Sequence, residues 1–126
     1  NFTARVLTLA AKETFSEKEK VIEKVEFKIK ETKVVVDEKI RQFKLHEALA
    51  HIWELLAFGD AYVNETQAWK REDKNVIFSL VTLLDNVAFL LQPFMPETAE
   101  KITKRIVWEG DALTIKPGDV LFPRHT

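Results

Sequence analysis

The sequence predicts an all-α protein, an up-and-down bundle of about five helices that ends in a short extended or hairpin tail. The chain has only three glycines and four prolines in 126 residues, which leaves few turn residues for a β-rich fold. The prolines stand at positions 93, 96, 117 and 123, so none interrupts the first ninety residues. Apolar residues recur at helical spacing. We expect one domain over residues 1–126, with the tail at 110–126.

The first predicted helix covers residues 1–12, where Phe2, Val6 and Ala10 share one face. Its pattern is already running at residue 1, so we expect this helix to be longer in a parent chain that carries a preceding domain. The second covers residues 17–42 and is predicted to start at the capping box Ser16-Glu17-Lys18-Glu19, because a serine and a glutamate so spaced bond free backbone N–H groups.

Three further helices are predicted at 45–66, 74–92 and 96–108. The helix at 74–92 is apolar nearly all round, which is typical of the middle of a bundle. Pro93 is predicted to stop it and Pro96 to open the next helix. We assign Trp53 to the core, as part of an apolar stripe, and Trp108 likewise. Beyond Trp108, a turn signal at 116–119 separates short runs at 112–115 and 120–122, which favours a small hairpin.

Composition excludes several classes of protein. The absence of cysteine excludes disulfides and thiolate metal sites, and it fits the reducing cytoplasm, where we expect the protein to act. No uninterrupted apolar run is long enough to span a membrane, so we expect no membrane partner. The net charge of −1 argues against a generic nucleic-acid binder. Any RNA binding must therefore depend on a few placed side chains.

No motif in the sequence points to a catalytic site. Glycines occur only at 59, 110 and 118, which excludes a Gly-rich phosphate loop. His46 and His51 resemble a zinc-protease motif that is one residue too long, and the two histidines would lie about 140° apart around a helix. We therefore expect no metal site, no catalytic residue and no cofactor, and we expect that this chain alone is not an enzyme.

The strings at 1–5, 45–49, 60–69, 91–102 and 121–124 resemble segments of methionyl-tRNA synthetases, members of the class I aminoacyl-tRNA synthetases. Asn1-Phe2-Thr3-Ala4-Arg5 resembles the Asn-x-x-x-Arg segment of the first helix in the family's anticodon-binding domain. The stretches 45–49 and 60–69 resemble the family's third helix and the tryptophan that follows it. The strings at 91–102 and 121–124 are similar to its last helix connection and its tail. The similarity runs in order along nearly the whole chain.

This resemblance implies that the chain binds methionine tRNA and reads its CAU anticodon, beside a catalytic domain that activates methionine with ATP and charges the tRNA. Carried over by position, the residues that read the anticodon are Asn1, Arg5 and Trp69. Asn1 and Arg5, spaced i and i+4, would point from one helix face toward base edges. The indole of Trp69 would stack on an unpaired base. In an up-and-down bundle, the first and third helices end at the same pole.

Further candidates for phosphate or loop contacts are Asp60, Asn64, Lys70 and Arg71. The chain departs from the family pattern at three positions. Ala68 stands where the family usually has proline before the tryptophan. Asp60 and Asn64 reverse the usual order of asparagine and aspartate at the end of the third helix.

Other interpretations of these residues stay open. Trp69 could cap the bundle core, Arg5 could form a surface ion pair, and Lys70 and Arg71 could be solvated loop charges. Two other functions also stay open, a helical protein-docking module without RNA and the anticodon domain of a leucyl-, isoleucyl- or valyl-type synthetase.

Overall fold

The computed structural model describes residues 2–11, 20–67, 74–109 and 112–115. Within these ranges lie five helices, α1 (Phe2–Ala11), α2 (Glu23–Arg41), α3 (Leu45–Thr66), α5 (Lys74–Leu91) and α6 (Pro96–Arg105). They are followed by the short strands β1 (Ile106–Glu109) and β2 (Ala112–Ile115). The predicted all-α bundle is confirmed. Pro96 opens α6 in its first turn, as the sequence predicts.

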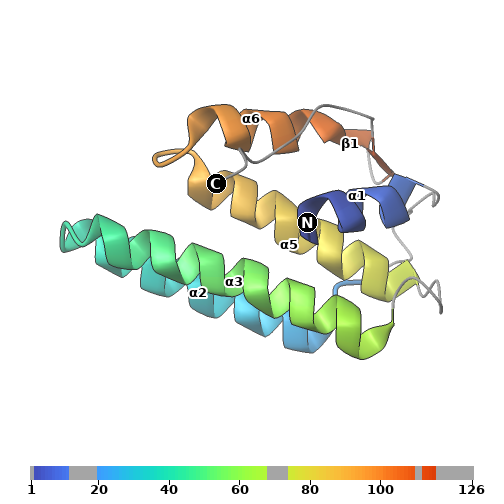
Figure 1. The fold of residues 1–126 in the computed structure, drawn as a ribbon, viewed down its shortest axis with the longest axis horizontal. Helices are drawn as coiled ribbons and strands as arrows, with labels where there is room; N and C mark the ends of the chain where they lie inside the picture. The colour runs from blue at the N-terminus through green and yellow to red at the C-terminus, as the bar shows by residue number, and fades with distance from the viewer. Residues whose placement is uncertain (1, 12–19, 68–73, 110–111, 116–126) are drawn as a thin grey trace, which may run out of the picture.

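The helices form layers around α5 (Figure 1). In that view α2 and α3 lie side by side below α5, and α1 and α6 lie above it. The helix α5 contacts each of the other four helices. Helices α1 and α3 run in the same direction and end on the same side of the bundle, which confirms the predicted shared pole (Figure 1).

The core is centred on α5. Its buried residues are Val76, Ile77, Ser79, Leu80, Val81, Leu83, Leu84, Val87, Ala88 and Leu91. These positions cover roughly 200° of the helix circumference, and the remaining side, which includes Phe78, Thr82 and Phe89, is exposed or half-buried. By length and composition α5 could cross a membrane, but 61% of it is buried inside the bundle. Its apolar character is therefore that of a core helix.

The helix α2 begins at Glu23, so the predicted start at residue 17 is wrong. Residues 20–22 are not helical, and Ile22, the residue before the helix, has an extended backbone (φ −66°, ψ 135°). The reason is a pair of bonds to α5. The backbone N–H of Ile22 donates to Ser79 Oγ (2.8 Å), and that of Lys20 donates to Asn75 Oδ1 (3.1 Å). Ser16, the predicted cap, lies outside the described residues.

Replacing Ser79 with alanine is expected to lower the free energy of unfolding by about 1–2 kcal/mol, because it removes the acceptor of the half-buried Ile22 N–H. Thr82→Ala is the matched control. Among the described residues, the Thr82 hydroxyl bonds a carbonyl of its own helix, Phe78 O (2.9 Å), and its loss should change stability by less than about 0.5 kcal/mol. Urea unfolding of both variants measures the difference. Equal effects would show that the Ile22 bond contributes nothing.

The C-terminal end of the bundle also differs from the prediction. The helix α6 ends at Arg105 instead of residue 108, and Ile106–Glu109 forms β1. β1 pairs antiparallel with β2, Ile106 opposite Ile115, a pairing that the sequence did not predict. The hairpin predicted between 112–115 and 120–122 stays a prediction, because 120–122 lie outside the described residues. The run Ile106-Val107-Trp108 is β-branched and aromatic and therefore favours a strand. Residues 116–126, the rest of the predicted tail, lie outside the described residues.

Trp53 does not lie in the core. It is 38% exposed, whereas its neighbour Ile52 is fully buried. The buried face of α3 consists of Ala48, Ile52, Leu55, Gly59, Tyr62 and Val63. One step along a helix turns a side chain by 100°, which takes residue 53 off that face. The side chain of Trp108 lies outside what the structure describes.

Candidate nucleic-acid interface

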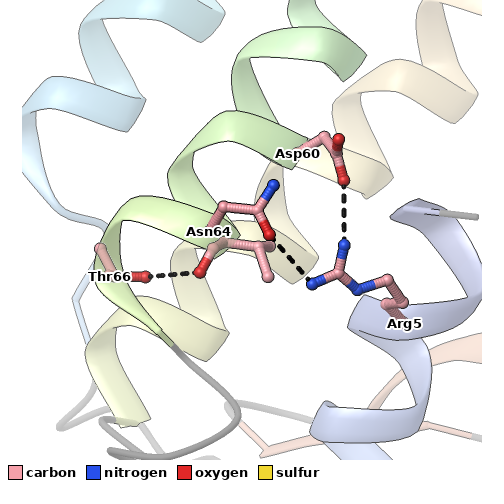
Figure 2. A network of polar contacts seen from close by, with 5 residues as sticks. Arg5, Asp60, Asn64 and Thr66 are labelled. Carbon is pink, nitrogen blue, oxygen red and sulfur yellow. Dashed lines mark hydrogen bonds and ion pairs between the residues drawn. The ribbon is translucent and has the colours of Figure 1, made fainter.

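Arg5 bridges α1 and the C-terminal part of α3. Its Nη1 donates to Asp60 Oδ1 (3.3 Å) and its Nη2 donates to Asn64 Oδ1 (3.2 Å). Asp60 and Asn64 are spaced i and i+4, so they lie one turn apart on the same face of α3 and both face the guanidinium (Figure 2). The side chains of Arg5 and Asp60 are 41% and 47% exposed. The three residues therefore form a polar cluster at the surface.

Hydrogen bonds within α3 fix the C-terminal end of the helix next to this cluster. The hydroxyl of Thr66 donates to the carbonyl oxygen of Tyr62 (2.7 Å) and lies 3.5 Å from that of Val63. Gln67 then adopts the left-handed conformation (φ 52°, ψ 48°), which ends the helix, and its N–H bonds to Val63 O. The chain therefore leaves α3 in a defined direction at residue 67.

Lys24 of α2 contacts the same end of α3. Its Nζ lies 3.6 Å from Glu65 Oε2, and 6.0 Å and 5.8 Å from the ring centroids of Phe58 and Tyr62. These rings are stacked, with an interplanar angle of 9°. An ammonium near aromatic rings contributes about 0.5–1 kcal/mol at an exposed site. The last turns of α3 are thus held by charged residues of both α1 and α2.

A close approach between α1 and α3 places Arg5 within reach of its partners. The ring of Phe2 packs directly on Gly59, and a Cβ added to Gly59 would lie 3.0 Å from both Cε atoms of that ring. Gly59 is buried and immediately precedes Asp60. Because the glycine lacks a side chain, α1 can approach α3 closely enough for the Arg5 bonds to form.

Gly59→Ala is expected to lower the free energy of unfolding by about 1–3 kcal/mol, because the added methyl group overlaps the Phe2 ring. In a Phe2→Ala background the same change should instead raise stability by up to about 1 kcal/mol, since alanine favours a helix more than glycine does. Thermal unfolding of the four proteins of this cycle gives the two effects. If Gly59→Ala changes the free energy of unfolding in the same direction with and without the Phe2 ring, the ring does not require glycine at position 59.

The structure describes three of the seven residues for which the sequence predicts a role, and it brings these three together. Arg5, Asp60 and Asn64 form the cluster, in an arrangement that also agrees with the surface ion pair considered for Arg5. The other four, Asn1, Trp69, Lys70 and Arg71, lie outside the described residues.

Sequence reasoning did not identify Lys24 and Gly59 as residues that hold this end of the bundle. Lys24 is one of many lysines in a charged helix, and its partner Glu65 is 41 positions away in the chain. Gly59 stands inside a helical pattern, which is a signal for close packing that could have been used.

The two histidines of the zinc-protease-like string do not form a metal site with their neighbours. His46 is exposed, and Nδ1 of His51 lies 3.3 Å from Glu54 Oε2, its neighbour one turn along α3. Among the residues that the structure describes, no group of three or more histidine, cysteine, aspartate or glutamate side chains could hold a metal ion.

The cluster combines chemical groups that suit the edge of a nucleic-acid base. The guanidinium is a planar donor, and the carboxylate and the amide beside it supply acceptors and an NH₂ group. Unpaired bases of RNA loops are recognised through such hydrogen bonds on their edges. The partial exposure of Arg5 and Asp60 leaves these groups within reach of a ligand.

Comparison with known proteins gives a consistent result. The family described as the anticodon-binding domain of tRNA ligase matches residues 12–119. A methionine–tRNA ligase of Clostridium acetobutylicum is 36% identical, in an alignment that covers 71% of this chain and 17% of the relative. A methionine–tRNA ligase of Methanopyrus kandleri is 34% identical, over 65% of this chain and 13% of the relative. A methionine–tRNA ligase of Bacillus cereus is 41% identical, over 53% of this chain and 13% of the relative.

The chain thus spans less than a fifth of the length of these relatives. The resemblance to methionyl-tRNA synthetases that the sequence strings indicate is confirmed by these similarities. The family match covers most of the chain, including α2, α3, α5 and α6. The chain belongs to the family of anticodon-binding domains of tRNA ligases.

Proposed function

We propose that this domain recognises the CAU anticodon of methionine tRNA, and that the Arg5–Asp60–Asn64 cluster forms part of the surface that reads it. The observation that carries the proposal is the position of Arg5. Its guanidinium is held by two hydrogen bonds at the end of α3, directly before the segment that contains Trp69. Trp69 follows Asn64 by five positions in the sequence, which supports a joint role of the tryptophan and the cluster.

The bonds to α3 prepare Arg5 for recognition. A free arginine side chain has many rotamers, and ordering one on binding costs about 0.5–1.5 kcal/mol. Two bonds to neighbouring turns of one helix orient the guanidinium in the unbound protein. Because Asp60 and Asn64 each supply one oxygen, exchanging the aspartate and the asparagine keeps both bonds possible. This explains how the reversed order in this chain is compatible with the same role for Arg5.

We further propose that the parent protein is a methionine–tRNA ligase of the cytoplasm. Its catalytic domain would activate methionine with ATP and charge the tRNA, while this domain would contribute recognition without a cofactor or a catalytic residue of its own. The support is the similarity to three methionine–tRNA ligases, each several times longer than the matched part of this chain.

Titration with RNA hairpins tests the function. The fluorescently labelled anticodon stem-loop of methionine tRNA is titrated with the chain, beside a stem-loop in which CAU is replaced by GAU or by CAG. We expect the CAU hairpin to bind at least tenfold more tightly than either control. Equal binding of all three would contradict anticodon recognition, and tighter binding of GAU or CAG would favour the domain of an isoleucyl- or leucyl-type synthetase. No binding of any hairpin would favour the docking module.

Arg5→Ala separates a base-reading role from a surface ion pair. The Arg5–Asp60 ion pair is partly exposed, and such a pair contributes at most about 1 kcal/mol to stability. We therefore expect a small change in unfolding but a weaker affinity for the CAU hairpin, by roughly tenfold or more. The matched control is Arg41→Ala, which removes another exposed arginine–aspartate pair, on α2. If Arg5→Ala and Arg41→Ala both bind the hairpin with the affinity of the unchanged chain, Arg5 has a structural role alone.

A further inference from the structure

A furrow runs between α2 and α5, on helices that do not contribute to the Arg5 cluster. It consists of two adjoining hollows of about 500 and 300 Å³, which share Lys33 of α2 as a lining residue. Lys20 and Phe78 line one hollow, and Ile40 and Phe89 line the other. We call the two together the α2–α5 furrow.

The side chains that line the furrow include more lysines than carboxylates. Its two carboxylates are already paired, Glu26 with Lys30 (2.9 Å) and Asp37 with Arg41 (3.2 Å). Lys20 and Lys33 form no ion pair with any residue that the structure describes. A ligand in the furrow would therefore meet two ammonium groups that no described carboxylate pairs, and it would bind best with carboxylates of its own.

The other end of the furrow is apolar. Phe89 is 64% exposed and Ile40 is 36% exposed, while Leu90 and Pro93 form part of the lining. Large apolar side chains are usually buried. Several exposed ones beside a groove therefore indicate a binding site for a partner. The furrow thus combines an apolar end with basic residues along its length.

The dimensions match one α-helix. Phe78 and Phe89 line the two hollows from the same helix and are eleven residues apart, or about 16 Å at 1.5 Å per residue. An amphipathic helix of three to four turns covers about that length, with anchors at i, i+4 and i+7. A polynucleotide is a poorer match, because its affinity depends on many neutralised phosphates, and the described lining of the furrow has two lysines outside any ion pair.

We propose that the α2–α5 furrow binds an acidic amphipathic helix of a partner protein. The apolar face of that helix packs on Phe89 and Ile40, and its glutamates or aspartates lie beside Lys20 and Lys33. The proposal is independent of anticodon recognition, since Arg5, Asp60 and Asn64 belong to α1 and α3. It gives this domain a second binding surface, for protein, in addition to the one proposed for RNA.

A pair of designed peptides tests the proposal. The probe is a fluorescein-labelled helical peptide of about 14 residues with leucines at i, i+4 and i+7 and glutamates on both flanks, and its partner carries lysines instead. We expect the 126-residue chain to bind the glutamate peptide at least tenfold more tightly than the lysine peptide. The double variant Lys20→Glu with Lys33→Glu should reverse that preference, and Phe89→Ala should weaken binding of the glutamate peptide by roughly tenfold.

Chemical-shift mapping shows where the peptide binds, and the CAU hairpin serves as the control for folding. The charge-reversed double variant and Phe89→Ala should each bind the CAU hairpin with the affinity of the unchanged chain. The proposal is overturned if the charge-reversed variant keeps the glutamate preference, or if the perturbed resonances lie away from α2 and α5. It is also overturned if the hairpin itself perturbs the furrow, which would make the furrow an RNA site. Concentration-dependent self-association that Phe89→Ala abolishes would assign the furrow to a second copy of the chain.

Discussion

Leu80→Ala is expected to lower the free energy of unfolding by about 2–5 kcal/mol, the largest effect of any single change proposed for this protein. Leu80 is fully buried on α5, the helix that contacts the other four. The substitution removes apolar contacts and leaves a cavity that neighbouring helices cannot close completely, because each is held by further contacts. Natural domains are stable by only about 5–15 kcal/mol, so this variant should be close to unfolding at physiological temperature.

Urea unfolding followed by far-ultraviolet circular dichroism measures this loss. Phe89→Ala is the control on the same helix, since its side chain is 64% exposed and its loss should change stability by less than about 1 kcal/mol. The midpoint of the Leu80→Ala transition should fall while its slope against urea stays unchanged. Similar effects of the two substitutions would contradict the central position of α5.

Trp69→Ala is expected to weaken binding of the CAU hairpin by roughly 1–3 kcal/mol, which corresponds to the loss of one base stacked on an indole. Trp69→Phe should keep part of the affinity, because a smaller aromatic ring can still stack. The unfolding free energy should change much less than it does in Leu80→Ala. This prediction depends on the resemblance at 60–69 and on the direction in which the chain leaves α3 at Gln67.

Trp53→Ala is the matched control for this experiment. Trp53 belongs to α3 and is 38% exposed, so this substitution tests whether the loss of any accessible tryptophan weakens hairpin binding. It should leave hairpin affinity unchanged. If Trp69→Ala keeps the affinity for the CAU hairpin but unfolds the domain, Trp69 caps the bundle core. That result would favour the protein-docking module. If both substitutions weaken binding equally, the effect does not arise from a specific stack.

The sequence by itself determined the five helices within the described residues and most of their ends. The predicted starts at residues 45, 74 and 96 agree with the structure, and the predicted ends at 12, 42 and 92 are each one residue too long. These features depend on local causes. Pro93 and Pro96 act on their own backbone, and the apolar stripes repeat with the period of the helix. The many apolar residues of α5 also identified the central helix, because its four neighbouring helices bury more than half of its circumference.

Contacts between distant residues decided the rest. The helix α2 starts late because Ser79 and Asn75, more than fifty positions away, bond the backbone of residues 20–22. Trp53 faces outward because the packing of α3 selected a different stripe of its apolar residues. Arg5 meets Asp60 and Asn64 because Gly59 lets α1 approach α3. Spacing along the chain contains no information on such pairs, since their geometry exists only after the helices have packed.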